Sequence, residues 1–141
     1  MSDILKMDIP ALEAFLERDF TQVADMFGLD ALDETELTVR LRVQEQHLRP
    51  GGTVSGPSMF ALADVAMYLA ILARIGPVGL AVTTNCSIDF MRKPAAGVDL
   101  IAKARVLKLG RVLAVGDVLL FSEGQADPVA RASLTYSIPK H

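Results

Sequence analysis

A long apolar segment with a single charge near its centre constrains this chain more than any other feature. From Pro57 to Ala73 the only charged residue is Asp64, and a helix drawn through the segment is apolar nearly all the way round. Such a helix must be buried, because one sheet face and solvent together cannot accommodate it. The fold therefore has to wrap around this helix, and the carboxylate inside it needs an explanation.

The segment is better interpreted as a buried helix than as a membrane span. Residues 59–73 are roughly 15 apolar-rich positions, whereas a bilayer needs roughly 20, and a central Asp costs about 2.5–3.5 kcal/mol on insertion. Pro57 suits the first helical turn, with Ser55 or Gly56 as the N-cap. Gly76-Pro77 predicts where the helix ends.

The segments around the helix predict an antiparallel sheet. Residues 36–44 alternate apolar and polar side chains, as a half-buried strand does. Four further strand-like runs follow the helix, at roughly 80–91, 98–108, 112–121 and 129–138. Short turns join these runs, and successive hairpins exclude a parallel βαβ arrangement. Residues 8–19 predict an amphipathic helix capped by Asp8, and residues 20–28 either continue it or pack loosely.

These elements predict an α+β fold in which a curved five-stranded antiparallel sheet wraps around one long central helix, preceded by an N-terminal helix. A sheet this small leaves exposed edge strands, which pairing with a second subunit would protect. The chain has 141 residues and no internal repeat or linker, so residues 1–141 are expected to form a single domain.

Composition excludes several classes of partner. The chain carries 14 basic and 17 acidic residues, and its formal net charge of -3 does not indicate binding to nucleic acid. Cys86 is the only cysteine, which excludes an intrachain disulfide and favours a reducing compartment. The first residues show no secretory signal pattern. The expected location is the cytoplasm, with neither nucleic acid nor a membrane as a partner.

The sequence lacks the motifs of most common catalytic sites. The two histidines, His47 and His141, and one cysteine do not make a zinc site, and a Ser-His-Asp triad would depend on His47 alone. Ser55 is not in a G-x-S-x-G elbow, and Gly51-Gly52 belongs to no phosphate-binding loop. No metal and no cofactor is expected.

Asp64 is the remaining candidate for chemistry, and two interpretations of it stay open. It is either a buried carboxylate satisfied by backbone or hydroxyl groups, or a general base or nucleophile in a water-poor site. The preceding segment favours chemistry, because Gly56 begins a helix whose free N–H groups can stabilise an oxyanion. Pro57 removes one of these donors. The Gly56 N–H and the carboxylate two turns on are expected to flank a carbonyl lodged along the helix.

The stretch GGTVSGPSMFALAD resembles the helix-opening motif of hotdog-fold thioesterases of the phenylacetate-degradation (PaaI-like) group. The family pattern is G-x-x-H-G-G followed by a helix that bears a catalytic acid. Its His-Gly-Gly falls on Ser55-Gly56-Pro57, its acid on Asp64, and an Asn often found six residues before the His falls on Arg49. The stretches VTTNCSIDFMRKP and ARVLKLGRVLAV resemble the next strand and hairpin, so the resemblance covers nearly all of residues 36–138.

This resemblance implies a hotdog fold and an acyl-CoA thioesterase that works as a homodimer, often paired into a tetramer. Asp64 would attack the thioester or activate a water, and the Gly56 N–H would polarise the carbonyl. A hydroxyl from the neighbouring subunit often assists in the family, and it would fall here on Thr83 or Thr84. The expected substrate is a small or medium acyl-CoA or aryl-CoA.

The resemblance also assigns the CoA phosphates to basic residues near the strand ends, here Arg92, Lys93, Lys108 and Arg111. Ordinary turn charges are the alternative for each of them. Arg49 either binds a carboxylate or phosphate or is a surface residue, and Ser55 caps the helix beside the substrate.

Two other functions stay open. A hotdog protein can bind acyl thioesters or acids without turning them over, as a sensor or carrier. Hydration of enoyl-CoA is weaker, because dehydratase relatives generally use a His with an acid and no histidine lies on or near the predicted helix.

Overall fold

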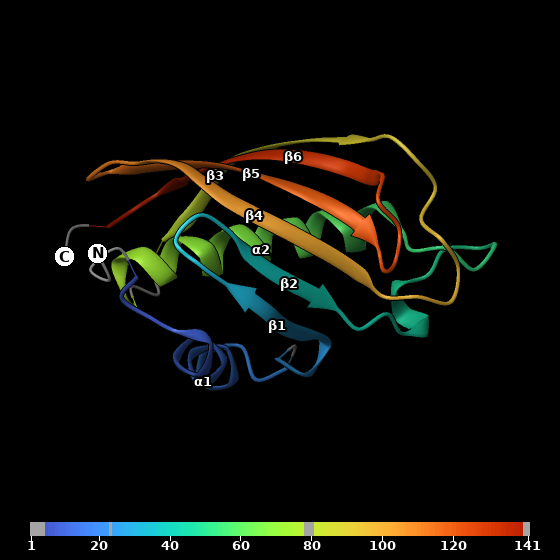
Figure 1. Cartoon of the computed structure of the whole chain (residues 1–141), viewed down its shortest axis with the longest axis horizontal. Helices are drawn as coiled ribbons and strands as arrows, with labels where there is room; N and C mark the ends of the chain where they lie inside the picture. The colour runs from blue at the N-terminus through green and yellow to red at the C-terminus, as the bar shows by residue number, and fades with distance from the viewer. Residues whose placement is uncertain (1–4, 23, 78–80, 140–141) are drawn as a thin grey trace.

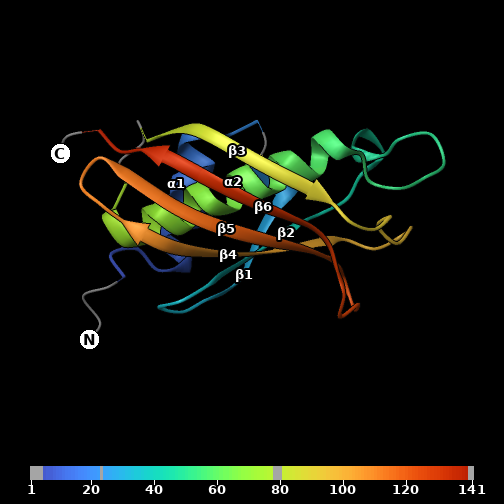
Figure 2. The same cartoon turned by 90° about the horizontal axis from the view of Figure 1, so that it is seen from above.

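One antiparallel sheet curves around one long helix in this protein (Figures 1 and 2). The computed structural model describes residues 5–22, 24–77 and 81–139. The six strands are β1 (Phe27–Leu32), β2 (Leu37–Leu41), β3 (Val82–Phe90), β4 (Leu100–Leu109), β5 (Leu113–Ser122) and β6 (Pro128–Ser137). Their spatial order is β1-β2-β4-β5-β6-β3, so β1 and β3 are the two edges. The predicted α+β class is confirmed.

The central helix α2 (Gly56–Ile75) lies in the curve of the sheet, which buries all of residues 66–73, whereas Pro57, Phe60 and Ala61 near its N-terminus are exposed in the single chain. Ser55 is the N-cap, since its hydroxyl oxygen accepts a hydrogen bond from the Ser58 N–H. Gly76 ends the helix with a φ of 93°, a backbone conformation that favours glycine. Within the described residues, α2 alone has the length and composition to cross a membrane, but 61% of its most apolar window is buried inside the fold.

The sheet contains one strand more than the five predicted from sequence. Residues 20–28, expected to continue the first helix or pack loosely, instead contain a 3-10 turn, η2 (Ala24–Met26), and the beginning of β1. Phe27, Gly28 and Leu29 are all buried. Because consecutive residues of β1 are buried, the alternating pattern that identifies a half-buried strand is lost.

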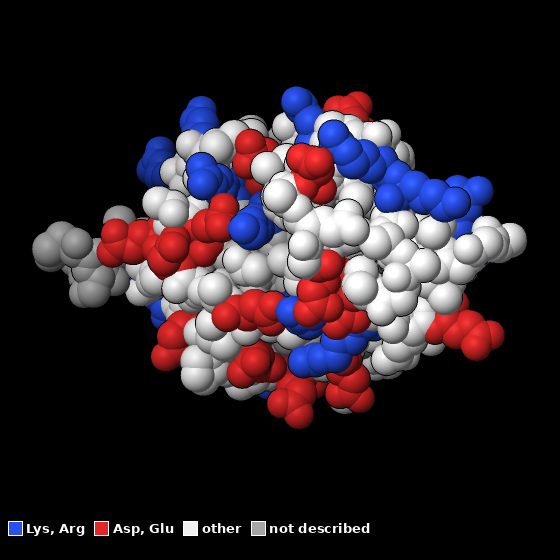
Figure 3. Space-filling model, turned by 45° about the vertical axis from the view of Figure 1, so that its right-hand side comes forward, with Lys and Arg blue, Asp and Glu red and all other residues white. Residues whose placement is uncertain are grey.

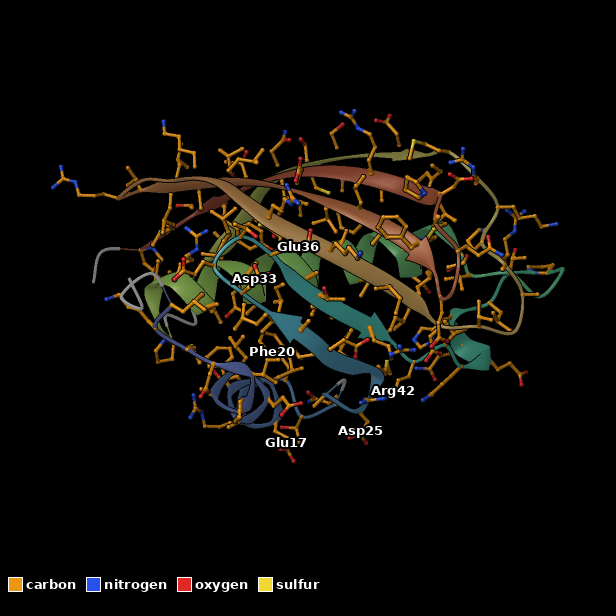
Figure 4. All side chains as sticks on the ribbon, in the orientation of Figure 1. Glu17, Phe20, Asp25, Asp33, Glu36 and Arg42 are labelled. Atoms are coloured by element: carbon orange, nitrogen blue, oxygen red, sulfur yellow. The ribbon has the colours of Figure 1, made fainter. Side chains whose placement is uncertain are left out.

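Side-chain hydrogen bonds to backbone atoms hold β1 against β2. At the turn between them, the Asp33 carboxylate accepts from the backbone N–H groups of Thr35 and Glu36, which lowers the pKa of Asp33 (Figure 4). At the other end, the Arg42 guanidinium donates to the carbonyl oxygens of Asp25 and Phe27 at 2.8 and 3.1 Å. These are local polar contacts, which hydrophobic periodicity does not report.

The N-terminal helix α1 (Ile9–Asp19) confirms the prediction for residues 8–19. The Asp8 carboxylate caps it by accepting from the Ala11 N–H at 3.0 Å. Its buried face consists of Leu12, Phe15 and Leu16. The helix lies beside β1 (Figure 1) and ends at Phe20, whose side chain returns toward α2. A second 3-10 turn, η3 (Glu45–His47), lies in the loop that leads into α2.

Candidate active site

The carboxylate of Asp64 meets two hydroxyl groups from the sheet. The Thr83 hydroxyl of β3 donates to Asp64 Oδ1 at 2.6 Å, and the Tyr136 hydroxyl of β6 contacts both Oδ1 and the Asp64 carbonyl oxygen. Asp64 itself is partly buried. In residues 5–22, 24–77 and 81–139, no group forms a hydrogen bond with the other carboxylate oxygen, Oδ2. One oxygen is therefore held in place and the other is left for a ligand.

The register of the sheet explains why these two hydroxyls converge. Thr83 and Tyr136 are direct cross-strand partners in the β3–β6 ladder, so their side chains lie on the same face. A register shift between Thr83 and Asn85 displaces the residue between them. Thr84 is exposed, and its hydroxyl donates to the Thr135 carbonyl at 3.3 Å. Of the two threonines considered from sequence, only Thr83 lies at Asp64.

The Thr83 hydroxyl and the Asp64 carboxylate that it contacts belong to the same chain. The resemblance had implied that the hydroxyl comes from the neighbouring subunit, whereas Thr83 contacts Asp64 of its own chain. Tyr136 was not identified from sequence at all. Its only signal is a polar hydroxyl on the buried face of β6, which otherwise carries Ala130, Ala132 and Leu134, and its contact with Asp64 depends on a register that the sequence does not state.

Tyr136 acts as a neutral hydrogen-bond donor. Its side chain is 2% exposed, and burial, reinforced by the hydrogen bond to Asp64, raises the pKa of Tyr136 far above its usual value. Burial also raises the pKa of the Cys86 thiol on β3, with a further contribution from the charge of Asp64. Both groups therefore stay protonated near neutral pH.

A cavity of about 200 Å³ opens beside Asp64. Its walls come from the end of α1, from α2 and from the facing strands. Among the residues that the structure describes, the lining is Phe20, Asp64, Val65, Tyr68, Ala81, Thr83 and Tyr136. The carboxylate and the two hydroxyls form one side of this cavity, and apolar and aromatic groups form the rest.

The N-terminus of α2 lies in a second, larger hollow of about 530 Å³. Its lining includes Gly56, the Phe90 ring and three of the basic residues considered from sequence, Arg49, Arg92 and Lys93. This end of the molecule comes forward in Figure 3, where basic side chains gather along the upper right of the surface. A helix N-terminus and three cations together favour an anionic ligand.

Gly56 supplies the free donor at this helix N-terminus. Pro57 has no N–H, and the Ser58 N–H is already bonded to the Ser55 hydroxyl. No carbonyl or side-chain oxygen in the described part of the chain accepts from the Gly56 N–H. Ser55 is positioned as predicted, although its hydroxyl is used by the cap and by Ser58.

Gly56 and Asp64 do not share a site within one chain. They are eight residues apart on a single helix, which places them about 12 Å apart along its axis. They also line different hollows. A reacting carbonyl must lie roughly 3 Å from both its oxyanion donor and its attacking group. The expectation that both groups flank one carbonyl along the same helix is therefore wrong for a single chain.

The four basic residues assigned to CoA also divide between two ends of the molecule. Arg92 and Lys93 lie by Gly56, whereas Lys108 and Arg111 lie at the β4–β5 turn, at the far end of the sheet (Figure 1). All four are exposed. They form no continuous rim within one chain.

His47 supports the loop before α2 and lies outside both hollows. Its Nδ1 accepts from the Gln44 N–H at 2.9 Å, and its carbonyl oxygen accepts from the Ser55 N–H at 2.8 Å. Burial lowers the pKa of His47, which favours the neutral acceptor. The second histidine, His141, lies outside the described residues.

Comparison with known proteins points to one family. The sequence profile of the thioesterase superfamily matches residues 51–129, which include the α2 N-terminus, Asp64 and Thr83. The acyl-coenzyme A thioesterase PaaI of Escherichia coli K12 is 33% identical over 105 residues, which cover 72% of each chain.

Solved structures agree with the sequence matches. A protein of Silicibacter sp. TM1040 with a provisional thioesterase assignment is 63% identical, with a TM-score of 0.90 over 96% of this chain and 94% of its own. A variant of the phenylacetic acid degradation protein PaaI from Thermus thermophilus is 31% identical, with a TM-score of 0.71 over 84% of this chain and 99% of its own.

The two tyrosines provide a direct test of the geometry at Asp64. Burial raises the pKa of both Tyr68 and Tyr136, so we expect the tyrosinate absorbance of the folded protein to stay low through about pH 10, where free tyrosine is half ionised. The pKa of each phenol is higher in the folded protein than in the unfolded chain. The protonated phenols therefore contribute to the free energy of unfolding below about pH 10, and this contribution is lost as the pH rises above that value. The chain contains 2 Tyr and no Trp, which keeps the signal clean.

Phenylalanine has no ionisable hydroxyl. The free energy of unfolding of a Tyr136→Phe variant should therefore fall less above about pH 10 than that of the parent, as measured by urea unfolding at each pH. A folded parent whose tyrosinate signal is already half developed at about pH 10 would show that neither phenol is held as described.

Proposed function

The chain belongs to the thioesterase superfamily, and we propose that Asp64 carries its chemistry, the hydrolysis of a small or medium acyl-CoA or aryl-CoA thioester. Its sheet and central helix form the hotdog fold, as the sequence predicted. The observation that supports the role of Asp64 is its geometry: two hydroxyls fix Oδ1, Oδ2 has no hydrogen-bond partner among the described residues, and Asp64 lines a cavity.

Hydrolysis requires that a nucleophile adds to the thioester carbonyl and that the carbon–sulfur bond breaks. In one route, Asp64 Oδ2 takes a proton from water while the water oxygen adds to the carbonyl carbon. In the other, Oδ2 itself adds and forms an anhydride, which water then cleaves. In both routes a backbone N–H donor such as that of Gly56 stabilises the oxyanion, and the CoA thiolate leaves and takes up a proton.

We place the donor and the carboxylate of each active site on different subunits of a homodimer. The two groups lie about 12 Å apart along one α2, so a second copy has to supply one of them. β3 is an unpaired sheet edge, and the apolar side chains of Val82, Phe90 and Met91 on or next to it are 55%, 52% and 43% exposed. A two-fold axis beside β3 would cover this edge and create two equivalent sites.

The basic residues fit this arrangement as contributions from two chains. Arg49, Arg92 and Lys93 would meet the CoA phosphates beside the Gly56 of their own subunit. Lys108 and Arg111 could reach the same CoA only from the partner, because they lie at the far end of the sheet. Pairing of two dimers, which the resemblance implies, is part of the same proposal.

The cellular location follows from chemistry rather than from geometry. Cys86 is a free thiol, and a partly buried free cysteine suits a reducing compartment. We propose that the protein acts in the cytoplasm, as one domain that requires no metal or cofactor for hydrolysis.

The Asp64→Asn variant tests the chemical role. It keeps the size of the side chain but removes the charge, so kcat for acyl-CoA hydrolysis should fall about 10²–10⁴-fold with little change in KM. Thiol release and thermal melting should be followed on the same preparation. Asp127→Asn, an exposed carboxylate in the β5–β6 turn, is the matched control and should retain parent activity. A destabilised Asp64→Asn protein that still releases CoA at the parent rate would make Asp64 a structural acid only.

Salt dependence tests the assignment of the CoA site. Exposed charge pairs are screened by salt, so the affinity for CoA should fall between low and physiological ionic strength. Lys93→Ala should weaken binding and flatten this salt dependence, whereas Arg18→Ala, an exposed cation on α1, should change neither. Isothermal titration gives both quantities, and an affinity independent of salt would contradict the assignment.

A further inference from the structure

The cavity beside Asp64 has an aromatic wall that extends to the N-terminal helix. The Phe20 ring, at the end of α1 (Figure 4), packs edge-on against Tyr68 of α2 with centroids 5.8 Å apart. Tyr68 in turn stacks on Tyr136 at 6.1 Å. Phe15 contacts both Phe20 and Tyr68, at 6.4 and 6.2 Å. A continuous series of rings therefore connects α1 to the hydroxyl that holds the Asp64 carboxylate.

The chemistry of the two hollows separates the two parts of a thioester substrate. The hollow at the α2 N-terminus is lined by three cations, which suit an anionic ligand. The described lining of the Asp64 cavity contains no basic residue, and beyond the carboxylate and its two hydroxyls it consists of aliphatic and aromatic side chains. An uncharged acyl group gains from burial there, whereas a phosphate would be repelled by Asp64.

The size of the cavity limits this acyl group. A cavity of about 200 Å³ is small beside the usual ligand pocket of about 300–1,000 Å³, so it suits an acyl group of modest size. A hexanoyl chain or a single aromatic ring is such a group.

Phe20 lies where it can set this limit without being part of the core. Its ring is 38% exposed, whereas Phe15, one turn earlier on α1, is 2% exposed. Phe20 also follows the last helical residue, and its N–H closes α1 on the Leu16 carbonyl at 2.8 Å. Shortening this side chain opens the cavity toward solvent and leaves the buried face of α1 intact.

We infer that the cavity beside Asp64 is the acyl pocket and that Phe20 is the residue that determines the longest acyl group it admits. This inference rests on the proposed thioesterase function. It makes α1 a specificity element, because the end of this helix supplies a ring that lines the pocket together with the carboxylate.

Chain-length profiles test the inference. kcat/KM is measured for butanoyl-, hexanoyl-, octanoyl- and decanoyl-CoA with the parent, Phe20→Leu and Phe20→Ala. One methylene in an apolar pocket is worth roughly 10–200-fold in kcat/KM, so the ratio of decanoyl-CoA to hexanoyl-CoA should rise at least about 10-fold in Phe20→Ala and less in Phe20→Leu. Phe121→Ala is the control. Phe121 lies on β5 under the Lys103 ammonium of β4 and does not line the cavity, so this variant should keep the chain-length profile of the parent.

The outcomes separate the inference from the proposed function. If the parent hydrolyses these thioesters and its chain-length profile equals those of Phe20→Ala and Phe20→Leu, the inference about Phe20 is wrong and the proposed function stands. If the parent hydrolyses none of them, the proposed function fails. In that case the inference about the pocket is tested by calorimetric binding of the same four thioesters. If the folded Phe20→Ala variant binds no longer acyl chain than the parent does, the inference is overturned as well.

Discussion

The need to bury the apolar helix α2 is the constraint on which the rest of this structure depends. A helix of 20 residues is about 30 Å long, and the sheet of one chain buries all of residues 66–73 of α2 but leaves Pro57, Phe60 and Ala61 exposed. To bury the helix, the sheet curves around it, which leaves edges at β1 and β3. A carboxylate on such a helix is costly in a dry interior unless hydrogen bonds satisfy it. Asp64 lies where the β3–β6 ladder supplies two hydroxyls, so the same wrapping that buries the helix also creates the site.

If Gly56 and Asp64 act on one carbonyl, as proposed, the length of the same helix leaves a single chain incomplete as a catalyst. The helix N-terminus provides a free donor and attracts anions, while the carboxylate lies two turns further on. Because the helix is rigid, no side-chain rotation brings the two together. A subunit therefore offers a basic, anion-binding end and a separate apolar, carboxylate-bearing cavity. In the proposed homodimer, each half joins the complementary half of the partner, and the exposed β3 edge is the surface proposed to bring them together.

Much of the fold could be predicted from the sequence because its signals are local. The helix bounds followed from Ser55, Pro57 and Gly76, and the later strands followed from alternation and turns. β1 could not be found in this way, since its consecutive buried residues do not alternate. The geometry of the candidate site could be anticipated only in part. Asp64 was identified from its own segment, whereas the contact with Tyr136 depends on cross-strand register, a long-range property that single-sequence patterns do not contain.

The most direct test of a site shared between subunits uses two variants that each remove one half. Asp64→Asn removes the charge. Gly56→Pro removes the N–H donor at a first-turn position that tolerates proline, and the extended backbone of Ser55 (ψ 156°) suits a residue before proline. Each variant alone should be nearly inactive. After the two are refolded together, a hybrid dimer carries one intact site, so random pairing should restore about a quarter of the parent thioesterase activity. A mixture that forms hybrid dimers and remains as inactive as its components would contradict the shared site.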